Sequence, residues 1–115
     1  MSHRVYVPLT LGGLANADAD GEVVADDDIV VAADDSEEEE YAALMTAADL
    51  STVLLEGPGR RVVLVAALAR VPEPGDVIPR QRWVAVHADA SDRPAAADPD
   101  EDLGWFGVQE MELVI

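Results

Sequence analysis

Short hydrophobic runs alternate with acidic segments along this chain, and the spacing within each run predicts its structure. Residues 4–9 (RVYVPL) place Val5, Val7 and Leu9 on one side of a strand, because side chains alternate along an extended backbone. The uninterrupted run 62–69 (VVLVAALA) begins with β-branched valines, which is typical of a central strand covered on both faces. These runs are the strongest strand signals in the sequence.

Weaker runs predict three further strands. They are residues 29–33 (IVVAA), residues 80–88 (RQRWVAVHA) and the segment around Trp105. Turn-forming residues 71–76 (VPEPGD) leave only a short connection between run 62–69 and run 80–88, so we expect these two strands to pair as a hairpin.

The clearest helix signal follows Ser36. Ser36 and Glu39 have the spacing of a capping box, and four consecutive glutamates lie where the helix dipole favours negative charge. Hydrophobic residues then recur at spacings of three and four, and Gly57 with Pro58 supplies a stop signal. The sequence therefore predicts a helix over residues 37–56.

A second, shorter helix is expected near the N-terminus. Thr10 can cap a brief helix over residues 11–14, although two glycines weaken it. The polar, acidic residues 15–28 are predicted to be a loop, and so is the acidic, Ala- and Pro-rich segment 89–102.

Together these elements predict a single α+β domain over residues 1–115. Its core would be a single mixed sheet of about four to five strands, with one long helix and one short helix packed on one face. A ferredoxin-like arrangement is one candidate topology.

The net charge of the chain is its most unusual property. Twenty-four acidic residues face seven arginines, the chain contains no lysine, and the formal net charge is −17. One interpretation, which we favour, is a general acidic composition that maintains solubility. The other is a surface that mimics nucleic acid or binds a basic partner. Direct binding to DNA or RNA is not expected in either case, because phosphate contacts need clustered lysine and arginine.

The remaining composition excludes several classes of site and location. Without cysteine the chain has no disulfide, thiolate nucleophile or cysteine-based zinc site. No apolar run approaches the roughly 20 residues that span a bilayer, and the N-terminus lacks the apolar segment of a signal peptide. We therefore expect a cytoplasmic protein, away from membranes, and no cofactor.

The acidic stretch NADADGEVVADD, residues 16–27, matches a twelve-residue calcium loop in part. Its candidate metal ligands are Asn16, Asp18, Asp20 and Asp27. Gly21 occupies the position of the sharp turn. Against this match, Asp27 is shorter than the usual bidentate glutamate, and the residues that follow favour a strand over a helix. Calcium binding is thus an alternative to the simpler interpretation, a solvated acidic loop.

His87 and Asp89 are the first place to look for an enzymatic centre. They share one face of a strand, so a hydrogen bond between imidazole and carboxylate is feasible. One histidine with one or two acids does not complete a three-ligand zinc site. A structural histidine at a strand end is the favoured interpretation, and an enzyme centred on His87 and Asp89 stays an alternative.

The few arginines suggest a further site. In a hairpin that turns near residue 74, Arg70 and Arg80 would lie near each other, and Arg82 would follow on the same face of the strand as Arg80. Together they would make a small anion pocket. The simpler interpretation is that Glu73 and Asp76 in the intervening turn pair with these arginines.

Aromatic residues are scarce, and three of them carry most of the aromatic mass: Trp83, Trp105 and Phe106. We expect them to anchor the core. If a tryptophan is exposed instead, it becomes the natural centre of a protein–protein interface, because tryptophan dominates binding hot spots.

Five sequence blocks occur in a familiar order: RVYVPLT, EEEEYAAL, RRVV, VAVHADASD and LGWFGVQE. Together they resemble a family of small uncharacterised actinobacterial proteins, a domain of unknown function that typically opens with Arg-Val-Tyr-Val-Pro. This chain departs from that pattern by being more acidic, and shorter before the long helix and before Leu103. The resemblance implies a cytoplasmic bacterial protein with one domain, and it implies no activity or functional residue.

These observations leave the biochemical function unknown and favour a small non-enzymatic domain that acts in protein interaction or regulation. A basic protein partner would complement its charge. The sequence does not fix the oligomeric state.

Overall fold

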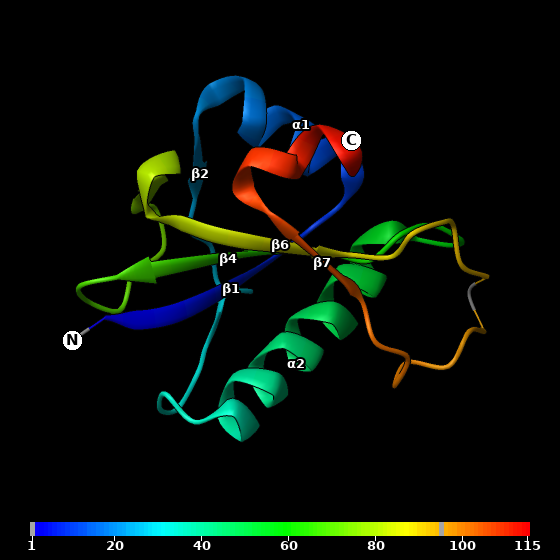
Figure 1. Cartoon of the computed structure of the whole chain (residues 1–115), viewed down its shortest axis with the longest axis horizontal. Coiled ribbons are helices and arrows are strands. Elements are labelled where there is room, and N and C mark those ends of the chain that lie inside the picture. Colours follow the sequence, from blue (N-terminus) through cyan, green and yellow to red (C-terminus); the bar gives the residue numbers. More distant parts are fainter. Residues whose placement is uncertain (1, 95) are drawn as a thin grey trace.

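A five-stranded antiparallel sheet forms the centre of the computed structural model, which describes residues 2–94 and 96–115 (Figure 1). Its strands, in spatial order, are β3 (Val30–Val31), β1 (His3–Leu9), β4 (Val62–Leu68), β6 (Trp83–Ala88) and β7 (Gly104–Gly107). All its pairings are antiparallel, so each strand runs opposite to its neighbours, whereas the sequence predicted a mixed sheet. The predicted pairing of run 62–69 with run 80–88 is confirmed as the neighbours β4 and β6.

Strand β4 is covered on both faces, as its hydrophobic run predicts. Its residues Val62 and Leu64 pack with Val5 of β1 on one face, whereas Val63 packs with Tyr6 on the other. All five side chains are buried. The alternation of side chains along each strand therefore divides the core into two clusters, one on each side of the sheet.

Helix α2 (Glu37–Leu55) confirms the predicted long helix and covers one face of the sheet. Its N-terminus is capped where the sequence indicates, because the Ser36 hydroxyl accepts a hydrogen bond from the Glu39 amide at 3.2 Å. The helix ends at Glu56, whose φ of 54° is left-handed, and Gly57 follows with a φ of 147°. Glycine suits this position because residues with a side chain rarely adopt such a positive φ.

Helix α1 (Leu11–Asp20) begins where expected and continues further than expected. The Thr10 hydroxyl accepts a hydrogen bond from the Gly13 amide at 3.0 Å. The prediction of a loop over residues 15–28 is wrong at its start, because Leu14 and Ala17 lie on one helical face and are buried in the core. That burial outweighs the weak helix propensity of the glycines.

The end of α1 leads into a second, two-stranded sheet that the sequence does not reveal. Helix α1 ends at Asp20 and is capped by Gly21, whose φ is 71°. Strand β2 (Glu22–Val24) then pairs with β5 (Val77–Pro79) in antiparallel register, with Val23 opposite Ile78. Because Ile78 is fully buried, this small sheet joins the α1 side of the core.

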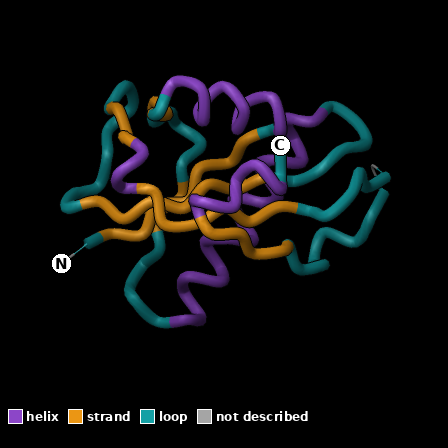
Figure 2. The backbone as a smooth tube through the Cα atoms, turned by 45° about the horizontal axis from the view of Figure 1, so that its top comes forward, coloured by secondary structure: helices purple, strands orange, loops and turns teal. Residues whose placement is uncertain are grey.

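The two helices lie on opposite faces of the central sheet, so the expectation that both share one face is wrong. Figures 1 and 2 show α1 and the C-terminal helical turns on one side of the strands and α2 on the other. The reason is that β1 and β4 bury hydrophobic side chains on both faces, and each face needs a cover. A ferredoxin-like arrangement, which was only a candidate, is not confirmed.

The C-terminal part of the chain contains β6, β7 and two 3-10 helices, η1 (Arg80–Arg82) and η2 (Val108–Leu113). The predicted strand over residues 80–88 thus begins later, at Trp83. No helix within residues 2–94 and 96–115 is long and apolar enough to cross a membrane.

Candidate functional site

The proposed calcium ligands do not lie on a calcium loop. Asn16, Asp18 and Asp20 are part of helix α1, where residues two apart point in different directions, and Asp27 follows β2. The Asp18 carboxylate accepts a hydrogen bond from Arg80 Nη2 at 2.6 Å. A twelve-residue calcium loop needs a different backbone conformation. This segment is helical instead, because Leu14 and Ala17 are buried in the core.

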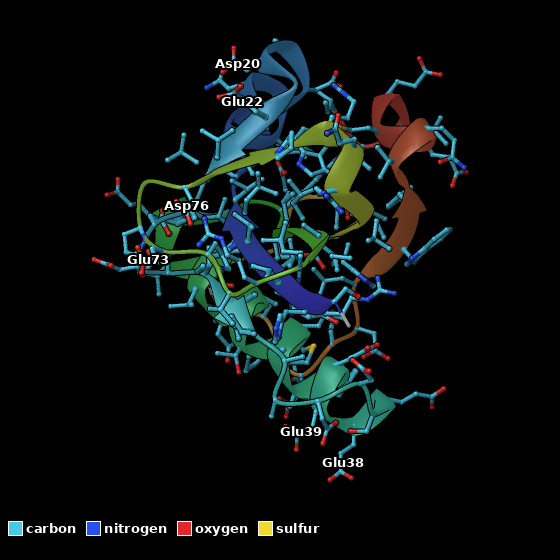
Figure 3. All side chains as sticks on the ribbon, turned by 90° about the vertical axis from the view of Figure 1, so that its left-hand side faces the viewer. Asp20, Glu22, Glu38, Glu39, Glu73 and Asp76 are labelled. Atoms are coloured by element: carbon cyan, nitrogen blue, oxygen red, sulfur yellow. The ribbon has the colours of Figure 1, made fainter. Side chains whose placement is uncertain are left out.

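Acidic side chains are also dispersed over the molecule as a whole. Figure 3 shows six of them at three separate places: Asp20 with Glu22, Glu73 with Asp76, and Glu38 with Glu39. Among the described residues, no three His, Asp or Glu side chains come close enough together to hold a metal ion. These acids do not form a shared site in this structure.

Asp89 pairs with an arginine and not with His87. Its Oδ2 accepts hydrogen bonds from Arg61 Nε at 2.9 Å and from the Arg61 backbone amide at 2.8 Å, and its Oδ1 accepts from Arg61 Nη2 at 2.8 Å. No hydrogen bond between His87 and Asp89 is present in the described part of the chain. The imidazole–carboxylate pair suggested by the sequence therefore does not form.

The environments of these two groups shift their pKa values. Burial lowers the pKa of His87 and so favours the neutral imidazole. Burial opposes ionisation of Asp89, but hydrogen bonds from Arg61 and the charges of Arg61 and Arg93 outweigh it. The pKa of Asp89 consequently lies below its ordinary value. Asp89 is therefore an ionised partner of Arg61.

Arg61 also holds the acidic segment 89–102 against the domain. Its Nη1 donates to the carbonyl of Pro99 at 3.1 Å, and its Nη2 donates to the carbonyl of Glu101 at 2.8 Å. Because only two residues separate Glu101 from the first residue of β7, these bonds hold the segment that leads into β7. Sequence reasoning missed this role, since its partners lie 28 to 40 residues away along the chain.

The arginines near the 71–76 turn separate into two groups. Arg80 contacts Asp18 and stacks over the Trp83 ring, 4.9 Å from its centroid. Arg70 Nη1 lies 3.3 Å from Asp76 Oδ2, which confirms the pairing expected for that arginine. Arg82 lines the same surface cavity as Arg70 and Asp76, whereas Arg80 is outside the lining of that cavity. Of the three arginines in the less favoured anion-pocket interpretation, only Arg70 and Arg82 line one cavity.

The three large aromatic residues differ in their exposure to solvent. Trp83 is buried, its Nε1 donates to the carbonyl of Ile78 at 3.2 Å, and Phe106 packs against the same core cluster. Both are core anchors, as expected. Trp105 is not, because 62% of its surface is exposed.

Trp105 lies on strand β7, at the free edge of the central sheet (Figure 1). It is opposite His87, which is opposite Val63, so Trp105 is on the face that α2 covers. Helix α2 packs mainly on β3, β1 and β4, and β6 lies between these strands and β7. The indole is consequently left without a covering layer.

The backbone of Trp105 also faces outward. The Gly107 amide donates to Glu110 Oε1 at 2.9 Å, so it points away from β6. In an antiparallel pair, opposed residues alternate between hydrogen-bonded and non-hydrogen-bonded. Trp105 is two residues before Gly107 and shares its orientation, whereas Phe106 between them faces β6. The N–H and C=O of Trp105 therefore point to the open edge of the sheet.

Acidic residues lie three to five positions before this tryptophan in the chain. They are Asp100, Glu101 and Asp102, and all three are exposed. The hydroxyl of Tyr41 in α2 donates a hydrogen bond to Asp102 Oδ1 at 2.8 Å. This hydrogen bond raises the pKa of Tyr41, and the charges of Asp102 and Asp100 add to the effect. Asp102 is three residues before Trp105, so their Cα atoms are at most about 11 Å apart. We call Trp105 with these three acids the β7 surface.

The fold and this surface define a small acidic α+β protein with three layers and an exposed tryptophan on an edge strand. The chain belongs to a family of unknown function (DUF6912), whose model matches residues 3–115. The resemblance to a domain of unknown function is confirmed to that extent, and the function of the protein is unknown. No curated protein and no solved structure gives a significant match.

Proposed function

We propose that this protein is a non-enzymatic interaction domain that binds an extended segment of a basic polypeptide along the open edge of β7. The observation that supports this most is the combination found at Trp105, whose indole is exposed and whose backbone N–H and C=O face outward. One residue thus offers both an apolar anchor and two hydrogen-bonding groups to a partner strand.

The energetics favour this residue over other exposed apolar side chains. A tryptophan can bury 150–250 Å² and forms binding hot spots more often than aliphatic residues do. Added strands bind through main-chain hydrogen bonds, and pockets for alternate side chains give specificity. Because β7 has only four residues and Glu110 occupies the Gly107 amide, the added strand is short and the complex is transient.

Charge complementarity specifies the chemistry of the partner. The net charge of −17, with Asp100, Glu101 and Asp102 three to five positions before the tryptophan, attracts a segment rich in arginine or lysine and repels acidic chains and nucleic acid. A partner strand with apolar residues alternating with basic ones would place the apolar residues on the Trp105 face and the basic residues near the acids.

The setting we infer is the cytoplasm of an actinobacterium. This rests on the sequence blocks that resemble those of actinobacterial proteins. The interaction needs no cofactor.

The test uses a ten-residue peptide of alternating valine and arginine, dye-labelled and blocked at both ends, with binding followed by fluorescence anisotropy. We expect saturable binding that weakens steeply between 0.05 and 0.3 M salt, because screening removes the long-range attraction. The Trp105→Ala variant should bind at least about tenfold more weakly. The matched control is Val53→Ala on the outer face of α2, where the side chain is 73% exposed, and it should bind within about twofold of wild type.

Three outcomes would count against the proposal. The first is equal binding by Trp105→Ala and wild type, and the second is equal binding of a valine–glutamate peptide. The third is a dimer of the free protein, seen by sedimentation and lost in Trp105→Ala, which would show that the edge binds a second copy of this chain.

A further inference from the structure

A second site lies at the other end of the sheet, where a cavity of about 410 Å³ opens between the end of β4 and strand β5. We propose that this cavity binds a small organic monocarboxylate with a compact apolar body. The carboxylate would pair with Arg82, and the apolar body would lie against the hydrophobic wall. This site is independent of the β7 surface and of the function proposed for it.

The unpaired state of Arg82 is the first reason. Five of the seven arginines form ion pairs with carboxylates: Arg60, Arg61, Arg70, Arg80 and Arg93. Arg82 forms none within the described residues, although the chain carries 24 acids. An arginine left without a carboxylate in so acidic a protein retains an unused fork of donors, which matches a carboxylate in two-point geometry.

The charge of the lining specifies a single negative charge on the ligand. Arg70, Arg82 and Asp76 are the charged residues that line the cavity, and Arg70 is already 3.3 Å from Asp76. Two positive charges and one negative charge leave one positive charge uncompensated. A monoanion would neutralise it, whereas a dianion such as phosphate would face Asp76 and the overall charge of −17.

The rest of the lining specifies the apolar body. It consists of Leu68, Ala69, Pro72, Val77 and Pro79. A cavity of this volume falls within the range typical of small-molecule sites, where apolar walls supply contact area and a few polar groups fix orientation. A single aromatic or branched aliphatic group with one carboxylate would fit these requirements.

The test titrates the ¹⁵N-labelled protein with sodium benzoate and follows backbone amide shifts by NMR. We expect saturable shifts at residues 68–82. Acetate lacks the apolar body and benzamide lacks the charge, so both should bind at least about tenfold more weakly than benzoate. Shifts that do not saturate, or benzamide that binds as tightly as benzoate, would overturn the proposal.

Two substitutions separate a specific site from general attraction to positive charge. Arg82→Gln should weaken benzoate at least about tenfold, because a charge-assisted pair is lost. The matched control is Arg4→Gln, which removes the same charge from an arginine that also forms no ion pair among residues 2–94 and 96–115 and does not line the cavity. This variant should leave the affinity within about twofold of wild type. Equal losses in both variants would overturn the assignment to Arg82.

A third variant tests the charge balance directly. Asp76→Asn retains an oxygen that can accept the Glu73 amide hydrogen bond, and it removes the negative charge from the lining. Benzoate should bind several-fold more tightly to this variant. Weaker or unchanged binding, with the NMR spectrum showing an intact fold, would contradict the proposed balance.

Discussion

Arg61 and Asp89 form a buried, two-point ion pair between the residue that precedes β4 and the residue that follows β6. The two nitrogen–oxygen contacts between the side chains are 2.8 and 2.9 Å, and both residues are almost completely buried. The remaining donors of Arg61 bond to carbonyls of the segment that leads to β7. The pair therefore links β4 and β6 to the segment that leads into β7, the edge strand that carries Trp105.

Loss of this pair should be strongly destabilising. Asp89→Asn leaves the Arg61 charge buried without compensation, and we expect the free energy of unfolding to fall by about 3–5 kcal/mol. Urea unfolding followed by circular dichroism measures the change. The control is Asp92→Asn, whose side chain is 78% exposed and 3.9 Å from Arg60, and it should cost less than about 1 kcal/mol. Similar losses in the two variants would show that the pair is not the stabilising element.

His87 should make stability depend on pH in the weakly acidic range. Burial lowers its pKa in the folded protein, so between that pKa and the ordinary value of about 6.5 the unfolded chain binds more protons. The free energy of unfolding should therefore rise with pH through this window and fall as the solution is acidified. His87→Gln should reduce that slope, as measured by urea unfolding at a series of pH values. A variant with the wild-type slope would contradict this assignment.

The net charge should make the protein more stable in salt. Carboxylates outnumber arginines by more than three to one, and screening relieves their mutual repulsion. We expect the melting temperature to rise between 0.05 and 1 M sodium chloride. The triple variant Asp26→Asn, Asp27→Asn, Asp28→Asn, in an exposed turn, should show a smaller rise. A melting temperature that falls with added salt would contradict this explanation.

Calcium should not bind at the acidic stretch 16–27 as a specific site. Its first three candidate ligands lie in helix α1, and Asp18 is already bonded to Arg80. Isothermal titration with calcium chloride should give no saturable heat for the wild type or for the variant Asp18→Asn, Asp20→Asn. A one-to-one saturable heat that the variant abolishes would show that this segment refolds around the ion.

Local signals in the sequence account for most of the elements. Thr10 and Ser36 cap helices where their side chains indicate, and the run of valines in β4 is covered on both faces. These features depend on neighbours a few residues away, and short-range physics specifies them.

Long-range contacts account for the errors and omissions. Residues 15–20 are helical because Ala17 packs on the core. Their acidic side chains and the two glycines before them favour a loop when the sequence is considered alone. The pairing of Arg61 with Asp89 and the exposure of Trp105 depend on which strands become neighbours. Local sequence patterns carry little information about such neighbours.

The most direct test of the account is amide hydrogen exchange at Trp105, with and without the valine–arginine peptide. In the free protein the Trp105 amide should exchange fast and the Phe106 amide slowly, because Trp105 faces the open edge and Phe106 faces β6. Saturating peptide should slow exchange at Trp105 and leave Phe106 unchanged. A Trp105 amide that is already protected in the free protein, or whose exchange the peptide does not change, would contradict the claim that this edge receives a partner strand.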